Sequence, residues 1–212
     1  NNKLVTLNKS TPAVLPATIL DLSNWKITLP TDTIETAKPD EILQPELATF
    51  SANPYFTVNE AKDGVVFRAH TGGVTTSGSS YPRSELREMT DNGTQNAGWG
   101  SGVGVHKMTI QQAITHVPVA KPHVVAGQIH DENDDQIMVR LEGMRLFLET
   151  DGDEVALLDA NYVLGTPFTV SFLVLNNTIR VTYNDVLKHD TSFFGDGLYF
   201  KAGCYTQSNL EK

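Results

Sequence analysis

A short charged segment, residues 81–89, carries the first side chains of this chain that could do chemistry. Side chains alternate between the two faces of a strand, so Arg83, Glu85 and Arg87 share one face. At about 3.3 Å per residue, the two arginines lie roughly 13 Å apart along the strand. Glu85 lies between them and is expected to hold both guanidinium groups through charge-assisted hydrogen bonds. On its own, the pattern is also that of a surface salt-bridge ladder.

A second segment, residues 124–130, places an amide and an imidazole on one strand face. Gln128 and His130 share that face, and Ile129 between them is expected to point into the core. A histidine near a strand end is more often structural than catalytic, so this pair indicates chemistry only in combination with other residues.

A third segment, residues 199–207, presents a lysine and a tyrosine. Lys201, Gly203 and Tyr205 alternate on one face, and the intervening small and apolar residues suit a core face. Gly203 leaves a gap in the polar row through which a ligand or a neighbouring side chain can approach closely.

If these three segments are neighbouring strands, their polar faces together form a cationic, hydrogen-bonding groove with one imidazole and one phenol. The set has no pair of free carboxylates, as a glycoside hydrolase needs, and no serine beside the histidine. It suits the binding of a carboxylate with proton removal and donation beside it, and it calls for no metal or cofactor. Its members are Arg83, Glu85, Arg87, Gln128, His130, Lys201 and Tyr205.

The elements that position these residues are predicted to be strands almost throughout. Short alternating runs are separated by Gly, Asp and Asn turn formers, a pattern typical of a sandwich, jelly roll or barrel. Short helices are expected only at residues 34–37 and 45–48. Further strands are predicted at residues 25–29, 64–69, 106–110, 136–141, 145–149, 168–174 and 178–183.

Composition bounds the class of protein. The 212 residues suit a single domain over 1–212, with residues 1–20 as an N-terminal extension. A single cysteine excludes an internal disulfide framework, and no apolar run is long enough to span a membrane. With 16 basic and 25 acidic residues, the net charge of −9 argues against a nucleic-acid partner.

Local charge matters more than net charge for a site. The basic residues of the three segments share one predicted face, whereas acidic residues gather in turns such as 131–135 and 151–154. The sequence therefore predicts an acidic surface around a basic groove, and that groove can accept a polyanion.

The three segments resemble, in order and spacing, the three signature motifs of the polysaccharide lyase family 7 alginate lyases. They read Arg-Ser-Glu-Leu-Arg at 83–87, Gln-Ile-His at 128–130 and Tyr-Phe-Lys-Ala-Gly-Cys-Tyr at 199–205. Residues 24–30 resemble the opening strand of that family. The resemblance implies an all-β, concanavalin-like jelly roll of two antiparallel sheets with a concave substrate groove. It also implies a secreted enzyme, here expected to be a monomer, with no cofactor and with one more strand after residue 212.

The resemblance further implies β-elimination in alginate, an acidic polysaccharide of 4-linked uronic acids. The C5 proton is removed, the oxygen at C4 leaves, and a 4,5-unsaturated sugar remains. Arg83 and Gln128, with His130 nearby, are expected to neutralise the uronate carboxylate, because fixed donors aimed at developing charge are usually the largest catalytic contribution. Tyr205 is expected to protonate O4. Substrate contacts and support are expected from Glu85, Arg87 and Lys201.

The identity of the base depends on the sugar. In mannuronate, H5 and O4 lie on the same face, so Tyr205 alone can serve as base and acid; in guluronate they lie on opposite faces, which favours His130 as base. In the family that the motifs resemble, isoleucine rather than valine at the position of Ile129 is associated with activity on guluronate-containing blocks, so the resemblance favours guluronate or mixed blocks. A lyase for another polyuronate such as glucuronan, and a non-catalytic alginate-binding jelly roll, remain alternatives. Residues 72–80 form either a mobile lid or an ordinary surface loop.

Overall fold

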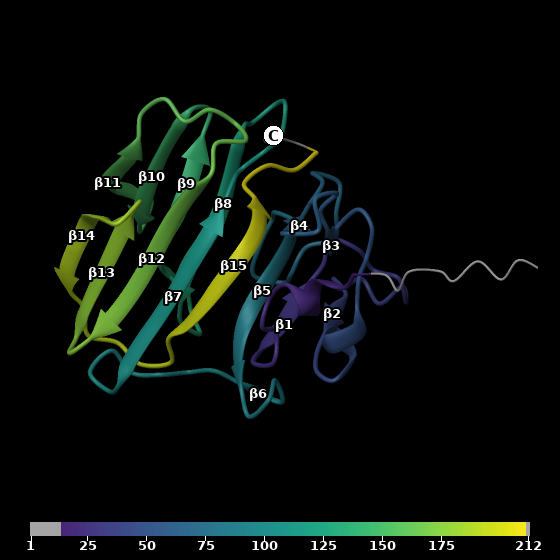
Figure 1. Cartoon of the computed structure of the whole chain (residues 1–212), viewed down its shortest axis with the longest axis horizontal. Helices are drawn as coiled ribbons and strands as arrows, with labels where there is room; N and C mark the ends of the chain where they lie inside the picture. The colour runs from purple at the N-terminus through teal and green to yellow at the C-terminus, as the bar shows by residue number, and fades with distance from the viewer. Residues whose placement is uncertain (1–13, 211–212) are drawn as a thin grey trace, which may run out of the picture.

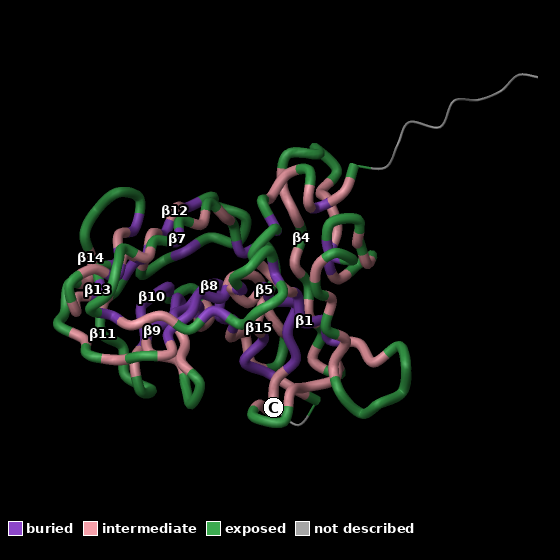
Figure 2. The backbone as a smooth tube through the Cα atoms, turned by 90° about the horizontal axis from the view of Figure 1, so that it is seen from below, coloured by how far each residue is buried: buried purple, intermediate pink, exposed green. Residues whose placement is uncertain are grey.

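Alternation of apolar and polar residues builds the sheets. In strand β12 (Phe168–Leu175) every second side chain is buried, beginning with Phe168. The computed structural model describes residues 14–210, which form two stacked antiparallel sheets with most of the core between them (Figure 1 and Figure 2). This is the all-β, jelly-roll architecture that the sequence predicts.

The larger sheet contains the three segments of chemical interest. Eight of its strands follow one another in hydrogen-bonded order, and β6 (Gln95–Asn96) pairs with β5 outside that order. The eight are β11 (Asp153–Asp159), β10 (Arg145–Thr150), β9 (Asp135–Glu142), β8 (His123–His130), β15 (Tyr199–Thr206), β5 (Arg83–Thr90), β1 (Trp25–Thr28) and β2 (Glu41–Ile42).

The smaller sheet covers one face of the larger one. Its order is β14 (Val186–Ser192), β13 (Thr178–Tyr183), β12 and β7 (Val105–Gln112). A separate hairpin pairs β3 (Phe56–Val58) with β4 (Val65–Phe67), and two short 3₁₀ helices are η1 (Pro16–Thr18) and η2 (Glu46–Thr49). Among residues 14–210, no helix has the length and apolar character needed to cross a membrane.

Two-residue turns join several of these strands. Asn176 and Asn177 connect β12 to β13, and Asn184 and Asp185 connect β13 to β14; all four have positive φ angles between 46° and 65°. Asn and Asp tolerate this left-handed conformation, and turns with two such residues match the right-handed twist of a hairpin.

The predicted helix at residues 34–37 is wrong. The Asp32 carboxylate accepts hydrogen bonds from the backbone N–H groups of Thr36 and Ala37 at 2.8 and 2.6 Å, and this local turn replaces helical bonding. The predicted helix at 45–48 is present as η2, displaced by one residue. Residues 1–13 of the proposed N-terminal extension lie outside the described residues, and the domain boundaries and a strand after 212 stay predictions.

A bulge in β8 sets which of its side chains face the site. Val124, Ala126 and Ile129 all belong to the core. Ile129 is an odd number of residues beyond the other two, so strict alternation along the strand would place it on the opposite face. The register of β8 with both neighbouring strands shifts beside Gly127, whose φ is +153°. A Cβ there would lie 2.7 Å from Ile110 Cδ1, so glycine allows the bulge that directs Gln128 away from the core.

Gly203 in β15 is the second glycine that the site requires. It pairs with Glu85 across the sheet, its φ is +136°, and an added Cβ would lie 2.6 Å from the Ser84 carbonyl oxygen. The gap that the sequence predicted is therefore occupied by neighbouring backbone and by the ring of Phe67.

We predict that Gly203→Ala lowers the unfolding free energy by about 3 kcal/mol, because backbone strain and overpacking add. For a chain of this size, that lowers Tm by roughly 6–12 °C, measurable by circular dichroism. Gly143→Ala is the matched control, since Gly143 also has a positive φ but meets nothing within 4 Å. Equal Tm losses in the two variants would contradict the steric argument.

Candidate active site

The three predicted segments are neighbouring strands, in the order β8, β15, β5. Tyr205 pairs with Arg83 across β15 and β5, and Lys201 pairs with Arg87. On the other side of β15, Lys201 pairs with Gln128. Side chains from three segments far apart in the sequence therefore share one patch of the sheet, on the face opposite the core.

The Glu85 carboxylate lies at the centre of this patch. It is 1% exposed and accepts hydrogen bonds from three side chains on three strands. Oε2 is 2.9 Å from a terminal nitrogen of Arg83 and 2.9 Å from Lys201 Nζ. Oε1 is 2.7 Å from Gln128 Nε2. A buried carboxylate so bonded fixes both cations and the amide in place.

Charge interactions determine the protonation of this cluster. Burial by itself raises the pKa of Glu85, but the charges of Lys201 and Arg83 outweigh it, so the pKa lies below its usual value. Burial also lowers the pKa of Lys201, an effect that the adjacent Glu85 opposes. Glu85 is therefore ionised near neutral pH, and it compensates the cations on either side.

Arg87 does not contact Glu85, which corrects the predicted clamp of two arginines on one carboxylate. The Arg87 guanidinium lies 3.8 Å over the ring of Tyr199 and donates a hydrogen bond to the Glu88 carbonyl oxygen. Lys201 takes the place that the sequence assigned to Arg87 because its strand lies beside Glu85. Arg87 remains half-buried on the same face of the sheet.

Tyr205 lies beside Arg83. The Arg83 guanidinium carbon is 3.9 Å from the centre of the Tyr205 ring, and the phenol oxygen is 2.8 Å from Ser79 Oγ. The Nε of Arg83 is buried and has no hydrogen-bond partner among residues 14–210.

His130 lies on the other side of the patch, where its Nδ1 is 2.6 Å from the Asp131 carbonyl oxygen and 3.2 Å from the Tyr199 hydroxyl. A carbonyl oxygen only accepts, so Nδ1 carries the proton and the lone pair of the neutral ring is on Nε2. Burial, followed by the charge of Lys201, lowers the pKa of His130. The imidazole is therefore neutral near pH 7 and can act as a base.

Acidic side chains are present on this sheet face as well as in turns, which modifies the predicted charge distribution. Two strands from Tyr205, Arg140 binds Glu142 at 2.7 Å and Glu149 at 2.6 Å. Both carboxylates share the one Arg140 guanidinium, so the face changes from an excess of positive charge around Glu85 to an excess of negative charge around Arg140.

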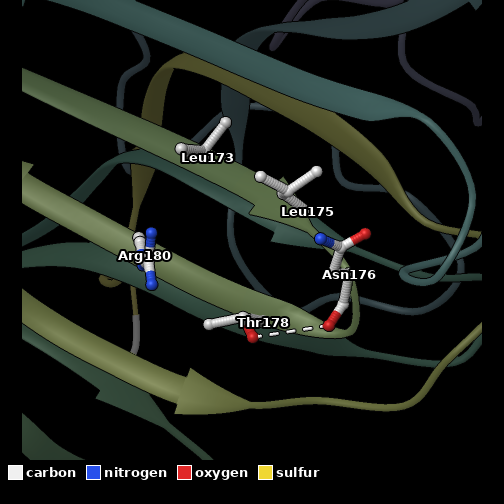
Figure 3. A pocket seen from close by; sticks show the side chains of 5 residues that line it. All are labelled: Leu173, Leu175, Asn176, Thr178 and Arg180. Atoms are coloured by element: carbon white, nitrogen blue, oxygen red, sulfur yellow. Dashed lines mark hydrogen bonds between the residues drawn. The ribbon is translucent and has the colours of Figure 1, made fainter.

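A surface hollow on the smaller sheet lies away from this chemistry (Figure 3). None of the predicted site residues lines this hollow, and the lining has one cation, Arg180. The lining residues are Leu173, Leu175, Asn176, Thr178 and Arg180. Among the described residues, no group of His, Cys, Asp and Glu is arranged to hold a metal ion. Cys204 packs against the core, and burial raises the pKa of its thiol to about 11.

Comparison with known proteins agrees with the motifs. The family model described as alginate lyase matches residues 20–212. The chain belongs to the alginate lyases of polysaccharide lyase family 7. The structure of the family 7 alginate lyase AlgAT5 is 53% identical, has a TM-score of 0.90, and the match covers 94% of this chain and 90% of that one.

Other relatives agree over similar lengths. The Corynebacterium sp. alginate lyase is 48% identical with a TM-score of 0.90, covering 95% of this chain and 90% of that one. An alginate lyase of Klebsiella pneumoniae is 26% identical over 93% of this chain and 86% of its own length. The family 7 alginate lyase A1-II' is 28% identical with a TM-score of 0.78, covering 93% and 92% of the two chains.

Two residues of this candidate site were given no role from the sequence. Tyr199 contacts both Arg87 and His130, and its alternation with Lys201 is the signal that could have assigned it to the site. Ser79 lies in an irregular segment, so no strand pattern indicates its contact with Tyr205.

We predict that Glu85→Gln lowers the unfolding free energy by about 3–5 kcal/mol, because Arg83 and Lys201 then remain buried without a counter-charge. The lowered pKa of Glu85 means that its contribution is complete above about pH 5 and is lost as the pH falls through that pKa. The difference between wild type and variant, measured by urea denaturation, should therefore shrink below about pH 4.

Glu154→Gln is the control for this measurement, because Glu154 forms a more exposed ion pair with Arg145. It should change stability little at any pH. Similar losses in both variants would contradict a central role for the Glu85 carboxylate.

Proposed function

We propose that this alginate lyase cleaves guluronate or mixed blocks by β-elimination and releases 4,5-unsaturated oligosaccharides. The observation that carries the proposal is the placement of Tyr205 and His130 on either side of the cluster ordered by Glu85. A proton donor, a neutral base and a carboxylate-binding pair thus share one patch. The same arrangement exceeds what a non-catalytic binding module needs.

The cationic cluster addresses the difficult step of the reaction. The C5 proton of a uronate is weakly acidic because the adjacent carboxylate is already negative. Arg83 and Gln128 are held by Glu85, and they neutralise that carboxylate and stabilise the enolate that develops when the proton leaves. Donors fixed before the reaction need no reorganisation during it.

Proton transfer is assigned to the two flanking residues. His130 removes the C5 proton through Nε2, since Nδ1 is engaged by the Asp131 carbonyl oxygen. Tyr205 donates its proton to the leaving O4, and Arg83 over its ring favours the negative charge that forms on the phenol oxygen. Two residues on different sides of the patch suit guluronate, in which H5 and O4 lie on opposite faces of the sugar.

Block preference has support from a relative and from the two-residue mechanism. Structures of A1-II' variants hold the product GGG and the substrate GGMG, in which G is the usual shorthand for guluronate. Ile129 is fully buried in the core, so any effect of this residue on specificity acts through the position of its neighbours. A preference for guluronate-containing blocks follows from the two-residue mechanism rather than from a contact by Ile129.

The remaining expectations follow from the substrate. A polymer such as alginate is too large to enter a cell intact, so we place the enzyme outside the cell as a secreted monomer. Arg87 and Lys201 extend the positive charge of the patch toward neighbouring uronates, and Glu85 supports Lys201 without touching the polymer.

The direct test is absorbance near 235 nm during incubation with polymannuronate, polyguluronate and polyglucuronate, because elimination creates a conjugated double bond. We expect the fastest rise with polyguluronate. A rise only with polyglucuronate would favour a lyase for that polymer, and binding without any rise would favour a non-catalytic module.

We predict that Tyr205→Phe lowers kcat by at least about 100-fold while alginate binding is retained, because the ring stays and only the donated proton is lost. Tyr55→Phe is the control, since this ring packs against His70 away from the site and should keep full turnover. Substantial turnover by Tyr205→Phe would remove Tyr205 from the role of acid.

We also predict a pH profile. An imidazole must be neutral to act as a base. Because the pKa of His130 is lowered, its ring stays neutral at pH values that reach below the ordinary pKa of histidine. The rate constant kcat/KM should therefore stay level as the pH falls to about 6.5 and decline only at lower pH. His130→Ala should abolish turnover, whereas His189→Ala on β14 should leave the profile unchanged. An acidic limb centred above pH 6.5 would contradict the assignment.

A further inference from the structure

The segment before β5 contributes a hydroxyl group to the site. Ser79 Oγ is 2.8 Å from the Tyr205 phenol oxygen, accepts a hydrogen bond from the Tyr81 backbone N–H at 3.0 Å, and is 3.1 Å from the Tyr81 carbonyl oxygen. Two of these three bonds are to the backbone that leads into β5. The position of the hydroxyl is therefore fixed by the same strand that carries Arg83.

Counting protons determines the direction of these bonds. A serine hydroxyl has one proton to donate and two lone pairs to accept with. The Tyr81 N–H uses one lone pair, and the Tyr81 carbonyl oxygen can only accept. All groups are satisfied when the neutral phenol of Tyr205 donates to Ser79 and Ser79 donates to that carbonyl oxygen.

This arrangement can reverse without moving a heavy atom. To act as the acid, the phenol O–H of Tyr205 turns from Ser79 to the leaving O4. When this O–H bond breaks and its proton passes to O4, the phenol oxygen becomes an anion that needs a donor. The Ser79 hydroxyl then rotates and redirects its hydrogen bond from the Tyr81 carbonyl oxygen to this anion, while its proton stays on Oγ. A hydrogen bond to a charged oxygen is stronger than a neutral one, so the new bond is favoured. Solvent then returns a proton to Tyr205.

We propose that Ser79 is a positioning residue for Tyr205, holding the phenol in place as a donor and stabilising the oxygen once its proton has left. The inference rests on the proposed role of Tyr205 as the acid. It gives residues 72–80 a part in the chemistry that neither a plain surface loop nor a lid would need.

The surroundings of Tyr205 favour a negative oxygen at this point. The Arg83 guanidinium lies over the Tyr205 ring, and the centres of the Tyr81 and Tyr205 rings are 6.5 Å apart. Lys121 Nζ donates to the Tyr81 hydroxyl at 3.2 Å and adds a second cation beside the segment. Glu85, the carboxylate at the centre of the patch, is engaged with its three donors.

The test compares kcat and KM on polyguluronate for five variants, one of which is Tyr205→Phe. Ser79→Ala should lower kcat by about 10- to 100-fold, the worth of one hydrogen bond to a charged oxygen, with KM within about two-fold. Ser79→Thr keeps the hydroxyl and should recover most of the turnover. Ser77→Ala changes an exposed serine of the same segment and should behave as wild type. Ser79→Ala combined with Tyr205→Phe should lose no more than Tyr205→Phe alone, because the two residues act as one unit.

Different results would overturn different claims. Unchanged kcat in Ser79→Ala, with Tyr205→Phe inactive, would overturn the role of Ser79 and leave the proposed function intact. Equal losses in Ser79→Ala and Ser79→Thr would assign the effect to packing and would also overturn it. Full turnover by Tyr205→Phe would overturn the proposed acid and, with it, this inference. Circular dichroism of each variant identifies any loss that comes from unfolding.

Discussion

A carboxylate without access to water is costly unless several donors replace its hydration, and the active face depends on how Glu85 meets that condition. Its partners come from β5, β15 and β8, so one side chain links three strands that are separated in sequence. Since two of the partners are cations, neutralising Glu85 would leave like charges facing each other. The carboxylate thus makes a concentrated positive site compatible with a folded sheet.

The sequence predicted the elements whose residues alternate clearly, and the structure confirms the jelly-roll fold and the adjacency of the three motif strands. It missed β14, where nearly every side chain is at least partly exposed and no buried face guides a prediction. It also gave Glu85 the wrong second cation, because alternation within one strand cannot show which neighbour across the sheet is nearer. The bulge at Gly127 and the contact of Ser79 depend on tertiary packing, for which no local pattern exists.

The net charge of −9 and the affinity for a polyanion are reconciled by where charges are placed. Around Glu85, two buried cations share one carboxylate, leaving an excess of positive charge. Around Arg140 the relation is reversed, with two carboxylates on one guanidinium. The electric field at a bound uronate is therefore determined by charges within one or two neighbouring strands. The total charge of the chain has little influence at this distance.

Strand order has a consequence for how the protein is made. β15 lies between β5 and β8, and of the strands in the larger sheet it is the last in sequence. Until residues 199–206 leave the ribosome, the strand that joins β8–β11 to the group of β1, β2, β5 and β6 is missing, and the facing edges of β8 and β5 lack their partner. Exposed edges of this kind are prone to pair with other chains. Insertion of β15 covers both of these edges and brings the side chains of the candidate site together in the same event, so assembly of the site coincides with protection from edge pairing.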